Sequence, residues 1–143
     1  MTYADTLSDQ DIRRILSDTR VIALVGASPR PERPSHRVGN FLAACGYRVI
    51  PVNPGQAGKT LFGETCVAQL SDIEEPVDMV DIFRNIDDVP GVVETALKDL
   101  KGLKYIWMQL GIAHEKSAAL ARAQGAEVVM DRCPAIEIPR LGM

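Results

Sequence analysis

The sequence lacks an apolar run long enough to cross a membrane. The longest such run, Val21 to Ala27, falls far short of the roughly 20 residues that a membrane helix requires. The acidic N-terminal segment MTYADTLSDQD has no apolar core of the kind found in secretion signals. We therefore expect a cytoplasmic protein with no membrane partner.

Cysteine and excess positive charge are also scarce. The three cysteines, Cys45, Cys66 and Cys133, are odd in number and share no close spacing, which argues against a disulfide framework and a zinc site. The 16 basic and 19 acidic residues give a net charge of −3, so we expect no nucleic-acid partner. The 9 prolines and 11 glycines are too few for a disordered or fibrous chain. The length predicts a single domain over residues 1–143.

Short apolar runs alternate with helical periodicity along the chain. The apolar runs predict five strands, over residues 20–25, 47–52, 77–83, 104–108 and 126–130. The periodic segments predict helices over residues 8–18, 35–46, 88–102 and 114–125, with one more short helix near Leu70. Ser35 is the expected N-cap of the second helix.

Strands that alternate with helices predict a doubly wound α/β domain with a five-stranded parallel sheet. With the strands numbered along the chain, we favour the spatial order 3-2-1-4-5. Ligands of such sheets bind beyond the carboxyl ends of the strands, where the strand order reverses. The loop after the first strand, residues 26–37, is therefore the candidate site.

This loop has two features that suit an anion. Gly26 lets the backbone approach a ligand closely, and amide groups at a helix start favour a phosphate. The amide groups expected to face it are those of Gly26, Ala27, Ser28, His36 and Arg37. The loop also concentrates arginine, which suits phosphate geometrically, at Arg30, Arg33 and Arg37. The alternative is a surface loop with solvated arginines and a glycine that the turn requires.

Two common nucleotide-binding motifs are absent. The dinucleotide fingerprint needs glycines where this chain has Ser28 and Pro31, and an acidic residue where the second strand is followed by Asn53. No P-loop sequence occurs, since residues 55–60 resemble one only superficially. Both observations argue against a typical NAD or nucleoside triphosphate site.

Five motifs in order resemble the small bacterial CoA-binding proteins. These are single-domain relatives of the CoA-binding domain of the succinyl-CoA synthetase alpha subunit. The motifs are VGASP at residues 25–29, GYRVIPVNP at 46–54, DMVDIFR at 78–84, WMQLG at 107–111 and DRCP at 131–134. The resemblance runs from about Asp9 to Leu141 and implies a Rossmann-like domain that holds coenzyme A.

The resemblance also implies where each part of the cofactor lies. The turn at residues 26–29 faces the pyrophosphate together with the Ser35 hydroxyl, and residues 52–54 line the adenine and ribose. Arg30, Arg33 or Lys59 meets the 3′-phosphate. Phe83 and Arg84 border the pantetheine arm, and Gln109 and Gly111 after the fourth strand reach the same edge. The full expected set is Gly26, Ala27, Ser28, Pro29, Arg30, Arg33, Ser35, Arg37, Val52, Asn53, Pro54, Lys59, Phe83, Arg84, Gln109 and Gly111.

Three functions are compatible with these residues. The first is non-catalytic binding of CoA or acyl-CoA, as a carrier or sensor. The alternatives are an NAD(P)-binding redox regulator and an acyl-CoA enzyme that requires a partner subunit. We expect binding without catalysis, because short motifs suggest no catalytic residue set and no metal site.

Four other side chains raise separate questions. Trp107 and Cys45 are expected in the core, although Trp107 and the first helix also offer surfaces for a homodimer. Cys133 is interpreted as a buried structural cysteine, with a mixed disulfide to the CoA thiol as the alternative. His36 either donates a hydrogen bond to the phosphates or is solvated.

Overall fold

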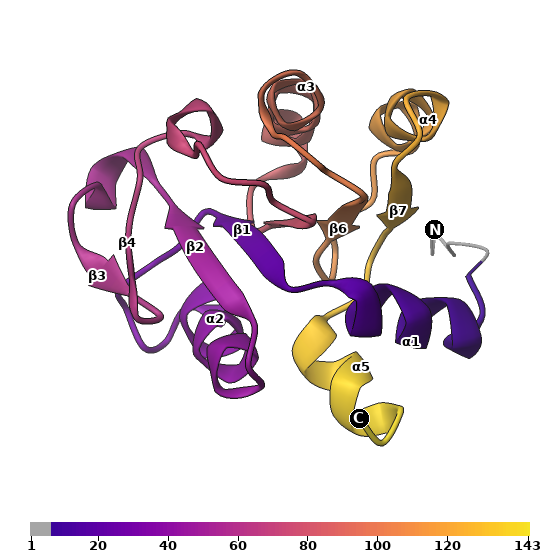
Figure 1. Ribbon diagram of the computed structural model, residues 1–143, viewed down its shortest axis with the longest axis horizontal. Helices are drawn as coiled ribbons and strands as arrows, with labels where there is room; N and C mark the ends of the chain where they lie inside the picture. Colours follow the sequence, from indigo (N-terminus) through magenta and orange to yellow (C-terminus); the bar gives the residue numbers. More distant parts are fainter. Residues whose placement is uncertain (1–6) are drawn as a thin grey trace.

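The computed structural model describes residues 7–143, which form one Rossmann-like α/β domain (Figure 1). Its sheet has five parallel strands in the order β2-β1-β5-β6-β7. The strands are β1 (Val21–Val25), β2 (Arg48–Val52), β5 (Met79–Ile82), β6 (Tyr105–Met108) and β7 (Glu127–Val129). The predicted fold class and the five predicted strands are confirmed.

The predicted strand order is wrong. The third of these strands, β5, pairs with β1 instead of lying beyond β2. The outer edge of β2 is occupied by Val67, whose amide donates to the Pro51 carbonyl at 3.0 Å and whose carbonyl accepts from the Asn53 amide at 2.9 Å. These hydrogen bonds use part of that edge, and β5 pairs with the other side of β1.

The connection from β2 to β5 contains more structure than its sequence pattern predicted. It comprises η1 (Pro54–Gln56), a small antiparallel hairpin of β3 (Thr60–Leu61) and β4 (Glu64–Thr65), and η2 (Leu70–Asp72). The last of these is the short helix expected near Leu70. The hairpin was not predicted, because two-residue strands are too short to show an alternating pattern.

Helices cover both faces of the sheet (Figure 1). The helices on one face are α1 (Asp9–Asp18), α2 (Pro34–Ala44) and α5 (Pro134–Arg140). Those on the other are α3 (Val89–Asp99), preceded by η3 (Ile86–Asp88), and α4 (Glu115–Ala123). Neighbouring residues of one strand point to opposite faces. Thus Trp107 packs on the side of α1, α2 and α5, whereas Ile106 packs on the side of α3 and α4.

Two helices differ from the prediction. Ser35 is not the N-cap of α2: Arg33 holds that position, Pro34 is the first helical residue, and Ser35 is buried in the first turn. Proline suits a first helical position, since its missing N–H would have no partner there and its φ is already helical. Helix α5 was not predicted, because it has seven residues and contains both Pro134 and Pro139.

The structure also decides two expectations about the core. Trp107 is completely buried and its Nε1 donates to the Arg132 carbonyl at 2.8 Å, so it packs in the core and offers no surface for a homodimer. Cys45 is exposed, contrary to expectation, because α2 ends at Ala44 and Cys45 follows as its C-cap. None of the helices within residues 7–143 is long and apolar enough to cross a membrane.

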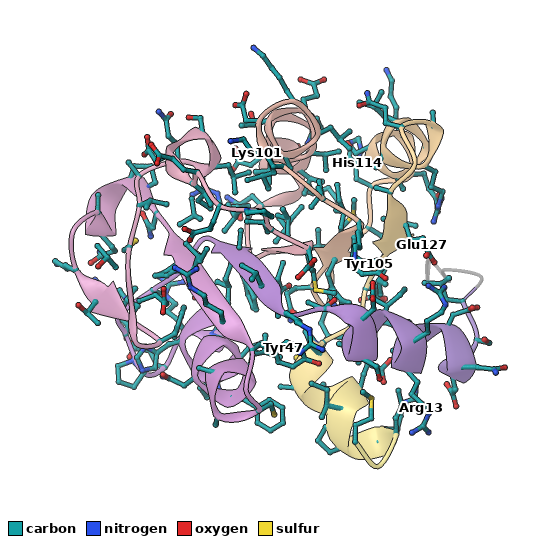
Figure 2. The ribbon with its side chains drawn as sticks, in the orientation of Figure 1. Arg13, Tyr47, Lys101, Tyr105, His114 and Glu127 are labelled. Atoms are coloured by element: carbon teal, nitrogen blue, oxygen red, sulfur yellow. The ribbon has the colours of Figure 1, made fainter. Side chains whose placement is uncertain are left out.

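Side-chain hydrogen bonds fasten α1 to the amino-terminal edge of the sheet. Arg14 donates to both carboxylate oxygens of Glu127, at 2.9 and 2.7 Å. The hydroxyl of Tyr105 donates to Asp18 at 2.5 Å, and burial together with this hydrogen bond raises the pKa of Tyr105 to about 12. Figure 2 shows Tyr105 and Glu127 on the two strands that α1 approaches. This edge is opposite the one where ligands of such sheets bind.

Candidate functional site

A cleft of about 1170 Å³ opens at the carboxyl-terminal edge of the sheet, between α2 and α5. Its walls come from the β1–α2 loop, the segments after β5 and β6, and the start of α5. The site was expected at this edge, and most of the expected residues lie there. Those that line the cleft are Gly26, Ser28, Arg30, Arg33, Ser35, Arg37, Asn53, Phe83, Arg84, Gln109 and Gly111.

Five of the expected residues do not line the cleft. Ala27 and Val52 are buried, with side chains in the two cores. Pro29, Pro54 and Lys59 are exposed, the last two in the connection that follows β2. The structure therefore brings the loop arginines together with the ends of β5 and β6, but leaves Lys59 outside.

Other lining residues were not predicted as site residues. They include Val38 and Phe41 of α2, Ile86 and Leu110 after β5 and β6, and Ile136 of α5. The apolar stripe of α2 contains Val38 and Phe41, but periodicity alone cannot separate a core contact from a cleft wall. Ile136 was missed together with the whole of α5.

Gly26 has a structural role at the turn after β1. Its φ is +92°, and a Cβ atom there would lie 2.2 Å from the carbonyl oxygen of Phe83. The amides of Gly26 and Ala27 both donate to the Val52 carbonyl, at 2.9 and 3.3 Å. The expectation that these two amides face a phosphate is therefore wrong, because the sheet already uses them.

The helix start is similarly engaged. The amides of His36 and Arg37 donate to the Arg33 carbonyl, at 3.1 and 3.4 Å, as the first turn of α2 requires. Of the five amides expected at the anion, that of Ser28 makes no hydrogen bond within the described residues. Its position beside the cleft makes it the backbone donor available to a ligand.

Side chains hold the loop in place. Asn53 Nδ2 donates to the Ala27 carbonyl at 2.7 Å, while Asn53 Oδ1 accepts from the Gly55 amide at 2.9 Å. His36 Nδ1 donates to the Ser28 carbonyl at 3.0 Å. His36 is thus neither a phosphate donor through this nitrogen nor simply solvated, since it ties α2 to the turn.

The four arginines of the cleft differ in their partners. Arg37 donates to the Glu32 carbonyl at 2.9 Å, and Arg84 forms an ion pair with Asp88 at 3.1 Å. Within residues 7–143, the side chains of Arg30 and Arg33 form no hydrogen bond or ion pair. These two guanidinium groups are the ones available to an anion.

The β6 side of the cleft is fixed by Asp131. Its carboxylate accepts from the Gly111 amide at 2.6 Å, and its own amide donates to the Ile112 carbonyl at 3.0 Å. Gln109 precedes this loop and is only 5 % exposed. The Gln109 Oε1 atom is shielded from solvent and has no hydrogen-bond partner in the described part of the chain.

Cys133 and His114, the second histidine of the chain, lie on opposite sides of the sheet. Cys133 is buried, lines the cleft and immediately precedes α5. His114 lies on the side of α3 and α4, away from α2 and α5 (Figure 2). It is the N-cap of α4, and its Nδ1 accepts from the Ser117 amide at 3.1 Å.

The sequence is similar to a known protein family and to a bacterial relative. Residues 20–139 match the family described as CoA binding domain. The chain is 36 % identical over 126 residues to the uncharacterized protein YneT of Bacillus subtilis, covering 88 % of this chain and 90 % of that protein.

Solved structures agree with the fold. The structure of cell-free ID.343 from Thermus thermophilus has a TM-score of 0.88 and 40 % identity, covering 94 % of this chain and 99 % of that one. A dinucleotide-forming acetyl-coenzyme A synthetase of Ca. Korarchaeum cryptofilum, in complex with phosphate and ADP, has a TM-score of 0.66 and 25 % identity. The similarity covers 82 % of this chain and 26 % of that synthetase.

Proposed function

Because this chain belongs to the CoA binding domain family, we propose that its cleft binds coenzyme A or an acyl-CoA, as a non-catalytic carrier or sensor. The observation that carries the proposal is the cleft at the carboxyl edge of the sheet, which is lined both by arginines without ion-pair partners and by apolar side chains. A CoA molecule has the same division, with a polyanionic nucleotide at one end and a thiol-bearing arm at the other.

The phosphate groups belong at the β1–α2 side. Arg30 and Arg33 line this side without ion-pair partners among the described residues, and Ser28 with its free amide belongs to the same loop. Arginine binds phosphate through paired, charge-assisted hydrogen bonds. The Ser35 hydroxyl, in the first turn of α2, adds a further donor.

The adenosine belongs beside Asn53, and the pantetheine arm belongs across the ends of β5 and β6. Asn53 lines the cleft where β2 ends. Pro54 and Lys59 lie outside the cleft in the connection after β2, where they would contact any part of the ligand that extends beyond it. Phe83 and Gln109 lie along the arm's path. A buried, unpartnered amide oxygen is costly, so Gln109 suits an N–H group of pantetheine.

A binding role without catalysis is supported by what the histidines do. His36 Nδ1 is committed to the Ser28 carbonyl, and His114 caps α4 on the other side of the sheet. Within residues 7–143, neither histidine hydrogen-bonds to a side-chain hydroxyl or thiol. The Arg84 guanidinium, which borders the cleft, is held by Asp88.

Calorimetric titration with CoA, dephospho-CoA and NAD tests the proposal. We expect CoA to bind most tightly, and dephospho-CoA about tenfold more weakly, because loop arginines lose the 3′-phosphate. NAD should not bind measurably, since the dinucleotide fingerprint is absent. Tighter binding of NAD than of CoA would support the redox alternative instead.

Substitution of the unpaired arginines makes this test specific. The Arg30→Ala/Arg33→Ala double variant should bind CoA at least tenfold more weakly and lose its preference over dephospho-CoA. Arg13→Ala is the matched control, because Arg13 is an exposed residue of α1 outside the cleft (Figure 2). An unchanged CoA affinity in the double variant would show that these arginines do not bind the ligand.

Chromatography of acyl-CoA after incubation with the protein separates binding from turnover. We expect the thioester to be recovered intact. Release of free CoA at a rate proportional to protein concentration would contradict the non-catalytic role and favour an acyl-CoA enzyme.

A further inference from the structure

Three large aliphatic side chains are exposed around the same cleft. Ile86 is 44 % exposed, and Leu110 and Ile136 are each 54 % exposed. They come from three separate segments, after β5, after β6 and within α5, yet all three line the cleft. Together with the partly buried Ile112, we call these residues the apolar end of the cleft.

The apolar end and the arginines of the β1–α2 loop follow different strands of the sheet. Arg30 and Arg33 belong to the loop after β1, whereas Leu110 and Ile112 follow β6, with β5 between the two strands. Polar and apolar parts of one ligand would therefore lie at opposite ends. The nucleotide of such a ligand would lie near β1 and its apolar part near β6.

Charged groups near the apolar end are already paired. Arg84 pairs with Asp88 at 3.1 Å, and Arg132 pairs with Glu137 at 2.7 Å. At Arg84, which lines the cleft, a carboxylate at the end of an acyl group would have to compete with Asp88 for the guanidinium. An uncharged hydrocarbon, in contrast, would remove three exposed aliphatic side chains from water.

We propose that the apolar end holds the aliphatic acyl chain of an acyl-CoA, so that the preferred ligand is a medium-chain acyl thioester and not free CoA. This inference rests on the proposed function. A slender chain suits this position because the three side chains line a cleft that also holds the proposed pantetheine site. The acyl chain continues from the thioester at the end of the pantetheine arm, which the proposed function directs toward β6.

Titration with a series of thioesters tests the inference. Calorimetry would compare free CoA with its acetyl, butyryl, hexanoyl and octanoyl thioesters. Each methylene buried should tighten binding by up to about fourfold. We therefore expect a dissociation constant that falls steadily with chain length until the apolar end is covered.

Substitutions locate the effect at the apolar end. For each variant, the readout is the ratio of the octanoyl-CoA to the CoA dissociation constant, so a general change in affinity cancels. Leu110→Ser and Ile136→Ser should each move this ratio several-fold toward one. Leu120→Ser is the matched control: Leu120 is 39 % exposed on α4, outside the cleft, and its variant should keep the wild-type ratio.

The outcomes separate the two proposals. Failure of every ligand to bind, CoA included, would overturn the proposed function and this inference together. Normal CoA binding with equal affinity for all thioesters would overturn the inference alone. So would a chain-length effect that survives both cleft substitutions. A flat series, accompanied by dimerisation that Ile136→Ser abolishes in analytical ultracentrifugation, would instead assign these residues to an interface between copies of the chain.

Discussion

Asp81 places a carboxyl group in the middle of β5, between Leu24 of β1 and Trp107 of β6. It is completely buried, and neither carboxylate oxygen has a hydrogen-bond partner in the described residues. Burial disfavours the charged form and raises the pKa of Asp81 well above its usual value. The folded protein therefore holds this residue as a neutral acid until the pH exceeds the raised pKa.

The stability of the protein should fall with rising pH because of Asp81. The unfolded chain loses this proton near pH 4, whereas the folded chain keeps it to higher pH. Its stabilising effect is thus complete below about pH 4 and is lost as the pH rises to the folded-state pKa. We expect the free energy of unfolding of the wild type, relative to Asp81→Asn, to fall by up to about 1.4 kcal/mol per pH unit in that window.

Urea unfolding from pH 4 to pH 8 measures this difference. Subtraction of the two proteins removes the contribution of carboxylates whose pKa is lowered, such as Asp18 and Glu137, which act in the opposite direction. Asp87→Asn, at an exposed position, is the control and should parallel the wild type. Parallel curves for the wild type and Asp81→Asn would show that Asp81 is not a buried neutral acid.

At Gly26 the chain passes close to the end of β5, where Phe83 follows the strand. Gly26→Ala should lower the free energy of unfolding by more than about 1–2 kcal/mol, because alanine at φ +92° is strained and its Cβ would overlap the Phe83 carbonyl. A bulkier valine would do the same, so loss of ligand binding in Gly26→Val would not be separable from loss of the fold. Urea denaturation provides the measurement.

Gly91→Ala is the matched control for that experiment. Gly91 lies in the first turn of α3, and a Cβ atom there would have open space around it. Alanine should therefore stabilise this helix by roughly 0.5–1 kcal/mol. Equal effects at the two glycines would contradict the special role of Gly26.

At the scale of elements, the helix ends show how local sequence signals succeed. Helix α1 begins with a capping box, in which Ser8 Oγ accepts from the Asp11 amide at 3.1 Å and Asp11 accepts from the Ser8 amide at 3.0 Å. These partners lie three residues apart, so the sequence alone can predict the helix start. The α2 start was mispredicted because Pro34 allows a helix to begin there without a side-chain cap.

Removal of the α1 cap should cost stability without altering the cleft. Ser8→Ala should lower the free energy of unfolding by about 1 kcal/mol, since the Asp11 amide loses its hydrogen-bond acceptor. CoA affinity should stay at the wild-type value, because α1 is fastened to the opposite edge of the sheet through Arg14 and Glu127. Denaturation and calorimetry on the same sample provide both readouts.

Ser17→Ala in the same helix is the comparison, since Ser17 is exposed and makes no capping contact. It should leave stability unchanged or slightly raised. A loss of CoA affinity in Ser8→Ala, beyond what unfolding explains, would show that α1 is coupled to the cleft.

At the scale of the whole molecule, the cleft joins segments that are far apart along the chain. The loop after β1, the ends of β5 and β6 and helix α5 all contribute to it. A ligand held between them stabilises only the folded state, because the unfolded chain does not assemble these segments. Binding and stability are therefore linked.

CoA should raise the free energy of unfolding by an amount that grows with the logarithm of its concentration relative to the dissociation constant. At a concentration 100 times the dissociation constant, the rise should be about 2.7 kcal/mol. Urea unfolding with and without CoA measures it, and NAD at the same concentration serves as the control. An equal rise with NAD, or none with CoA at that concentration, would contradict specific binding at the cleft.

Taken by itself, the sequence was sufficient for the five strands, for most helix ends and for the loop that begins the cleft, because hydrophobic periodicity and capping residues act over a few neighbouring positions. The strand order depends on pairings between distant parts of the chain, such as β5 with β1 and Val67 with the outer edge of β2, which local patterns do not specify. Two further features also depend on contacts between distant strands: the Gly26 amide donates to the Val52 carbonyl, and Asp81 is buried. Leu110 and Ile136 line the same cleft because of how β6 and α5 pack, and nothing in either local sequence specifies this.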